Sequence, residues 1–162
     1  MFDRFGEFDS AADINETAIN LRKEGDTENI WVLAEENGID NTQTEEFIKG
    51  GLLYLCDELD AALGKLEVEA KKIKTAEIFQ DWVGYIQGKC AEDEVFCRQV
   101  RRKGKSLKMV MGILLKWSFA HQYDVDKDIL EAAGVKTSRC TLGIPGMGTA
   151  KKLITEYYMK EV

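Results

Sequence analysis

The fold is decided by residues 76–121, which read AEIFQDWVGYIQGKCAEDEVFCRQVRRKGKSLKMVMGILLKWSFAH. In the first part of this stretch, apolar side chains recur every three or four residues, the spacing that places them on one face of an α-helix. They are Trp82, Ile86, Cys90, Cys97 and Val100. Gly104 ends the pattern, and Ser106 is a suitable N-cap for another helix. The stretch therefore predicts one helix over residues 76–103 and a second over residues 107–121.

Helix signals also precede this stretch. Ser10 and Asp13 form a capping box ahead of a helix that Gly25 ends, and Thr27 is expected to cap a second helix that stops at Asn37-Gly38. A further capping box, Thr42 with Glu45, opens a long amphipathic pattern that predicts one helix over residues 45–74. Gly50, Gly51 and Gly64 mark bends or close helix contacts within it.

Two shorter helices are expected after it, over residues 126–133 and 149–158. No segment alternates apolar and polar residues as a strand would, so we expect an all-α bundle of about six to seven helices. The chain has 162 residues, 44% of them apolar, and a single proline, a composition typical of one helical domain. A division into a small acidic helical unit at residues 1–40 and a larger bundle at residues 45–162 is predicted.

Charge is distributed unevenly along the chain. Residues 1–70 carry 18 acidic and 5 basic side chains, a net charge of −13, whereas residues 71–162 carry 11 acidic and 17 basic side chains, a net charge of +6. Such asymmetry suggests a partner that reads charge, either a nucleic acid or a nucleic-acid-binding protein. The alternative is an acidic, solvated helical face that keeps the protein soluble.

Six basic residues within eleven positions form the strongest candidate site. They are Arg98, Arg101, Arg102, Lys103, Lys105 and Lys108. On a helix the three arginines would share a face, and closely spaced guanidinium and ammonium groups bind phosphates and release counterions. The alternative is a solvated surface that offsets the acidic N-terminal unit or docks against it.

A glycine-rich turn precedes the last predicted helix, in the segment 143–158. Residues 144–154 resemble the hairpin of helix-hairpin-helix DNA-binding motifs, in which backbone amides contact phosphates. The residues that would do so here are Gly146, Gly148, Lys151 and Lys152. Ala150 follows Gly148 after one residue, a shorter gap than the motif usually has, so a plain helix-start turn is the alternative.

The remaining polar and aromatic positions predict structural roles. Asp93 lies on the apolar stripe, so we expect it to be buried and paired with a basic or amide group. Trp82, Tyr85, Trp117 and Phe119 are expected in the core. The single histidine, His121, stands at a helix end without catalytic partners.

Nothing in the chain indicates an enzyme, a metal site or a cofactor. Cys56, Cys90, Cys97 and Cys140 lack CxxC spacing, and we expect all four to be reduced packing residues. Cys90 and Cys97 are two helical turns apart, too distant to bridge. With no secretory signal or membrane span predicted, we expect a cytoplasmic location.

Residues 76–135 resemble the PcfK-like family of bacterial mobile elements. The matching features are Ile78-Phe79, Trp82 with Tyr85-Ile86, the segment 90–96 (CAEDEVF), and Lys103 with Lys105-Ser106-Leu107. That family includes inhibitors of type II CRISPR effector nucleases. The resemblance therefore implies a phage- or plasmid-borne protein that binds the guide-loaded nuclease and is not an enzyme.

Under this hypothesis the acidic half would occupy a positively charged nucleic-acid site on the nuclease, and Asp57, Glu58 and Asp60 are the candidate contact residues. The competing hypothesis is a nucleic-acid-binding accessory protein of a mobile element, which contacts DNA or RNA through residues 98–108. A scaffold role is a further alternative, and the amphipathic pattern over residues 45–74 would also suit a homodimer.

Overall fold

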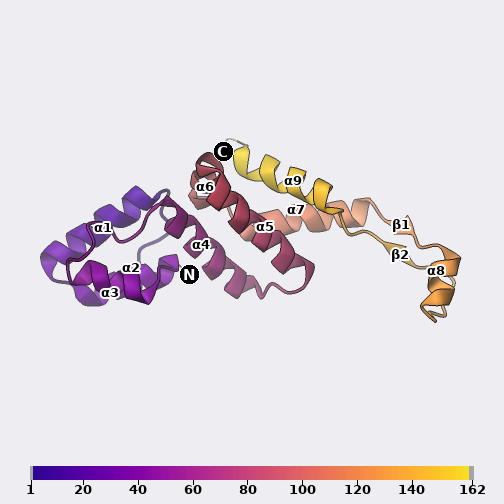
Figure 1. Ribbon diagram of the computed structural model, residues 1–162, viewed down its shortest axis with the longest axis horizontal. Helices are drawn as coiled ribbons and strands as arrows, with labels where there is room; N and C mark the ends of the chain where they lie inside the picture. Colours follow the sequence, from indigo (N-terminus) through magenta and orange to yellow (C-terminus); the bar gives the residue numbers. More distant parts are fainter. Residues whose placement is uncertain (1, 161–162) are drawn as a thin grey trace.

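The computed structural model describes residues 2–160, and these residues form a mostly helical molecule, which confirms the predicted all-α class (Figure 1). The helices are α1 Ala11–Glu24, α2 Thr27–Asn37, α3 Asn41–Ile48, α4 Glu58–Ile73, α5 Ile78–Glu92, α6 Glu94–Arg101, α7 Leu107–Ala120, α8 Lys127–Ala132 and α9 Met147–Met159. Two strands, β1 Tyr123–Asp124 and β2 Thr141–Leu142, form a short antiparallel ribbon that the sequence did not predict.

Helix caps explain most of these boundaries. The capping box of Ser10 and Asp13 opens α1 as predicted, and Gly25 ends it in the left-handed conformation with φ +74°. Ser106 caps α7, also as predicted. Asp26 caps α2 and Asp40 caps α3, where Thr27 and Thr42 were expected. Each of these aspartates accepts hydrogen bonds from amides in the first turn of its helix.

The predicted continuous helix over residues 45–74 is wrong. It is interrupted by an irregular segment, residues 49–57, which we call the 49–57 loop. Gly50 adopts φ +85°, which ends α3, and a new capping box of Asp57 and Asp60 starts α4. Apolar residues keep their helical spacing through this loop, so the sequence pattern did not indicate the break in the helix.

The predicted helix over residues 76–103 is also divided, at Asp93. The extended backbone of Asp93 (φ −133°) ends α5, and its carboxylate accepts a hydrogen bond from the amide of Phe96 to cap α6. Because the two helices diverge here, Cys90 and Cys97 do not stand two turns apart on one straight helix. The neighbouring Cys97 thiol and burial raise the pKa of the Cys90 thiol, and the Cys97 thiol donates to the carbonyl oxygen of Glu58 at 3.3 Å.

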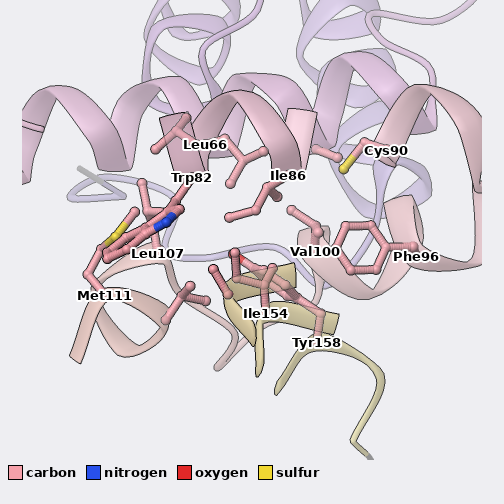
Figure 2. Close-up of a cluster of buried hydrophobic side chains, with 14 of the residues drawn as sticks. Leu66, Trp82, Ile86, Cys90, Phe96, Val100, Leu107, Met111, Ile154 and Tyr158 are labelled. Carbon is pink, nitrogen blue, oxygen red and sulfur yellow. The ribbon is translucent and has the colours of Figure 1, made fainter. Parts of the chain in front are cut away.

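Two hydrophobic clusters meet at α4. The N-terminal cluster joins α1, α2 and α3 to Leu55, Cys56 and Ala61, so the expected domain boundary near residue 40 falls inside it. The larger cluster joins α4 through Ala62 and Leu66 to α5, α6, α7 and α9. Figure 2 shows Trp82, Ile86 and Tyr158 converging in this larger cluster.

Gly64 lets α2 and α4 approach closely. A Cβ atom placed on Gly64 would overlap the carbonyl oxygen of Asn37, and one placed on Gly38 would overlap the backbone of Gly64. The close helix contact expected at Gly64 is therefore present. It holds the C-terminal end of α2 against the middle of α4.

An arm projects from the bundle beyond α7 and α9, formed by β1, α8 and β2 (Figure 1). Tyr123 pairs with Leu142 in the ribbon, and α8 has no buried residue. Phe119, at the base of the arm, is 72% exposed, so its predicted place in the core is wrong. Trp82 is buried in the core as predicted.

Substitution Gly64→Ala tests the close approach of α2 and α4. Alanine normally stabilises a helix interior relative to glycine by roughly 0.5–1 kcal/mol. At Gly64 the overlap reverses the sign, and we expect the free energy of unfolding to fall by about 1–3 kcal/mol in urea denaturation. Gly84→Ala is the matched control, because Gly84 is exposed within α5 with open space around it, and this substitution should stabilise. Equal stabilisation by both substitutions would contradict the contact.

Candidate functional site

The predicted basic patch is not one surface. Arg98, Arg102, Lys103 and Lys108 are exposed, whereas Arg101 is fully buried and Lys105 is 4% exposed. The prediction that Arg98, Arg101 and Arg102 share a face is wrong, because α6 packs on α4 with Arg101 inward and ends at that residue. Arg98 forms an ion pair with Glu94 at 2.7 Å.

The two buried members of the patch hold structural elements together. Arg101 donates from Nη2 to Oδ1 of Asn37 at 2.8 Å, which joins α6 to the end of α2. Lys105 donates from Nζ to the carbonyl oxygens of Tyr157 and Lys160, at 2.9 and 2.6 Å, and so caps the end of α9. Neither side chain is available to a ligand on the surface.

Lys65 and Glu69, one turn apart on α4, complete a buried polar network that the sequence analysis missed. Lys65, 1% exposed, donates from Nζ to Oε1 of Glu7 at 2.6 Å and to the carbonyl oxygen of Arg102 at 2.8 Å. Glu69 accepts a hydrogen bond from the amide of Leu107 at 2.6 Å. Burial lowers the pKa of Lys65 and raises the pKa of Glu69. In the sequence, the only indication of this network is the spacing of Lys65 and Glu69, which stand four residues apart and close to the apolar residues Ala62 and Leu66.

The predicted acidic residues lie at the start of α4. Asp57 and Asp60 form its capping box, and Oδ2 of Asp60 also accepts a hydrogen bond from Gln43 at 2.7 Å. Two of the three predicted contact residues therefore also have a structural role. Glu58, between them, is half-buried.

These carboxylates line a groove of about 1120 Å³, which we call the acidic groove. Its walls are α1, the 49–57 loop and the start of α4. The charged residues that line it are Glu16, Lys23, Asp57, Glu58 and Asp60, four carboxylates against one ammonium group. On the loop side, Leu53 is 77% exposed and Tyr54 is 62% exposed. The groove therefore combines negative charge with uncovered apolar surface.

The 49–57 loop is held in place by long-range hydrogen bonds from three side chains. Oδ1 of Asn15 accepts from the amides of Leu55 and Cys56, at 2.8 and 3.1 Å. Arg22 donates to the carbonyl oxygens of Phe47 and Leu52, and Gln43 donates to that of Leu55. Because its backbone is fixed, the loop presents Leu53 and Tyr54 in a defined position, which reduces the entropy lost on binding.

The other predicted positions have ordinary structural surroundings. Asp93 is half-exposed, not buried as expected, because it caps a helix end; its expected basic partner is Lys89, at 3.7 Å. Gly146 precedes α9, which begins at Met147, two residues earlier than predicted. Lys151 lies 5.2 Å from the ring centroid of Tyr85, and Lys152 lies 3.8 Å from Glu156, so each lysine has an intramolecular neighbour.

Within residues 2–160, no cluster of three or more His, Cys, Asp or Glu side chains could hold a metal ion. The four cysteines are free, and burial raises the pKa of Cys56 to about 12, so this thiol is protonated at neutral pH. His121 stacks on Trp117 at a centroid distance of 4.3 Å. None of the helices described is long and apolar enough to cross a membrane.

No family model, curated protein or solved structure matches this chain. The resemblance of residues 76–135 to the PcfK-like family is therefore carried by the motifs alone. In the structure five apolar members of those motifs, Trp82, Ile86, Cys90, Phe96 and Leu107, are buried, whereas Ile78, Phe79 and Tyr85 are half-buried. The five buried residues belong to the larger hydrophobic cluster, and none of them lines the acidic groove.

Charge-reversal substitutions should reduce the free energy of unfolding much more at the buried Arg101 than at the exposed Arg98. Arg101→Glu would place a carboxylate beside Asn37 in the interior, and we expect the free energy of unfolding to fall by about 3–5 kcal/mol. Arg98→Glu on the same helix replaces an exposed ion pair by a repulsion and should cost about 0.5 kcal/mol. Urea denaturation followed by circular dichroism measures both. Similar small losses would show that Arg101 is not an interior residue.

Proposed function

We propose that this protein is a non-enzymatic inhibitor that binds a type II CRISPR effector nuclease through the acidic groove and blocks its binding or cleavage of DNA. It would act in the cytoplasm of a bacterial host cell, carried there by a phage or another mobile element. The observation that carries the proposal is the fixed 49–57 loop, with exposed Leu53 and Tyr54 beside four carboxylates.

The chemistry of the groove suits a basic protein partner. Large exposed apolar side chains within a charged rim are typical of protein interfaces, where a few central aromatic and aliphatic residues dominate the affinity. The N-terminal 70 residues carry a net charge of −13, so they repel nucleic acid and attract a cationic surface. A CRISPR effector nuclease has such a surface in the channel that holds its nucleic acids and in the site that reads the short motif beside its target.

The choice of a CRISPR nuclease as the partner depends on the PcfK-like resemblance. Because five of the matching apolar residues are buried in the larger hydrophobic cluster, the resemblance supports a shared fold more directly than a shared binding surface. The proposed binding surface is the acidic groove, which lies outside residues 76–135.

The second candidate function is a nucleic-acid-binding accessory of a mobile element. Four exposed cations near the α6–α7 connection favour it: Arg98, Arg102, Lys103 and Lys108. Binding to phosphates through these residues would weaken steeply as the salt concentration rises. The burial of Arg101 and Lys105 removes two of the six cations on which this candidate relied.

The direct test is cleavage of target DNA by a guide-loaded type II CRISPR nuclease at increasing concentrations of the purified protein. We expect dose-dependent loss of cleavage and no binding of the protein to the DNA alone. Glu16→Lys combined with Leu53→Ser should raise the concentration for half-inhibition at least about tenfold, since it removes an apolar anchor and reverses one charge of the groove. Both residues lie on the surface, so the fold should be kept.

Glu131→Lys is the matched control, because it makes the same charge change on the exposed helix α8 of the arm. This variant should inhibit within about twofold of the unaltered protein. Unchanged cleavage with several type II nucleases would overturn the proposed function. Inhibition that survives the groove substitutions would keep the function and reject the groove.

A further inference from the structure

The first residues of the chain, Phe2–Asp9, form an extended strap across the two halves of the molecule. The amides of Asp3, Arg4 and Phe5 donate to the carboxylate of Glu36 on α2, at 2.8, 2.7 and 3.2 Å. Phe5 and Phe8 pack, half-buried, against the N-terminal hydrophobic cluster. The strap then reaches the connection between α6 and α7.

Two carboxylates of the strap bind this connection. Oδ1 of Asp9 accepts a hydrogen bond from the amide of Lys103 at 3.0 Å, and Oε2 of Glu7 accepts one from the amide of Gly104 at 3.4 Å. The other oxygen of Glu7 lies 2.6 Å from Nζ of Lys65. Gly104 adopts φ +82°, and successive amides around such a left-handed residue form a concave nest that binds anions.

The nest is therefore an oxyanion site occupied by carboxylates of the same chain. Two backbone amides and one ammonium group bind three different oxygens of Glu7 and Asp9, and donors of these kinds also bind phosphate. The rim of the site carries the exposed side chains of Arg102 and Lys103, with Nε of Arg102 3.9 Å from Asp9.

A buried arginine adds unused hydrogen-bond donors below the strap. Arg101 is fully buried, yet its Nε and Nη1 groups have no hydrogen-bond partner. Its guanidinium lies 5.7 Å from the ring centroid of Phe2, so the strap covers this cation as well. Unpaired buried donors are costly, and Phe2 keeps this cation covered while the strap is in place.

We propose that the α6–α7 connection is a binding site for a phosphate group of a nucleic-acid backbone, and that the strap blocks it by placing Glu7 and Asp9 where the phosphate oxygens would bind. The nest, Lys65 and the exposed cations on its rim form the site. Binding requires the strap to leave, and a segment without helix or strand that is held by a few hydrogen bonds is the part of a fold that opens most readily. This inference does not depend on the nuclease proposal.

The test is the affinity of the full chain for a fluorescein-labelled 20-base-pair DNA duplex, measured by fluorescence anisotropy. Glu7→Gln combined with Asp9→Asn removes both competing charges and keeps the side-chain shapes, and we expect it to raise the affinity at least about tenfold. The matched control is Glu24→Gln combined with Glu131→Gln. It makes the same change in net charge at two exposed positions away from the nest.

Further variants keep the test decisive if loss of the Glu7–Lys65 ion pair unfolds the protein. Glu36→Gln weakens the attachment of the strap to α2 and leaves the nest intact, so it should also raise the affinity for DNA. Adding Lys103→Glu to either strap variant should abolish the gain, because it places a negative charge on the rim. Equal affinity of the strap variants and the matched control, or a gain that survives Lys103→Glu, would overturn the proposal.

The phosphate group that binds this site could belong to a nucleic-acid backbone or to a small phosphate ligand, and a titration with inorganic phosphate distinguishes the two. In NMR titrations of the strap variants, DNA should shift the amide resonances of Lys103 and Gly104 at much lower concentration than inorganic phosphate does. If phosphate shifts these resonances and DNA does not bind, the nucleic-acid assignment is wrong and a small phosphate ligand replaces it.

Discussion

The structure depends on two cations, Lys65 and Arg101, buried between its two hydrophobic clusters. A buried charge is tolerated only with partners, so each cation fixes the elements that supply them. Arg101 ties α6 to Asn37 at the end of α2, and Lys65 ties α4 to the α6–α7 connection and to Glu7 of the strap. The close approach at Gly64 adds a steric constraint to this polar one. Together they join an acidic unit and a bundle with a basic surface into one arrangement.

This arrangement separates the two charged surfaces of the molecule. The acidic groove lies on the N-terminal side of α4, where Asn15, Arg22 and Gln43 hold the 49–57 loop. The exposed cations lie near the α6–α7 connection, where the strap meets them with carboxylates. The molecule thus neutralises part of its basic surface internally and leaves the acidic groove open. That asymmetry favours a basic protein partner over direct contact with nucleic acid while the strap is in place.

The parts of the fold that depend on neighbouring residues could be predicted from the sequence. The parts that depend on contacts between distant residues could not. The capping residues Ser10 and Ser106 and the apolar stripe through Trp82 and Ile86 are read from neighbouring residues, and the structure keeps them. The breaks at Gly50 and Asp93 were missed because apolar spacing continues across both. Arg101 was placed on a surface because its partner Asn37 is 64 residues away in the sequence. The acidic groove also depends on long-range contacts. Its acidic residues were candidates from the sequence, but Leu53 and Tyr54 are presented by a loop that Asn15, Arg22 and Gln43 hold in place.

Amide hydrogen exchange of the full chain, with and without the guide-loaded nuclease, tests whether the nuclease binds at the acidic groove. We expect slower exchange in the 49–57 loop and in α1 on complex formation, because a bound partner excludes water from the groove. Exchange in the arm around α8 should not change. Slower exchange in the arm, with no change in the groove, would reject the groove as the binding face and place the partner on the exposed apolar side chains of that arm.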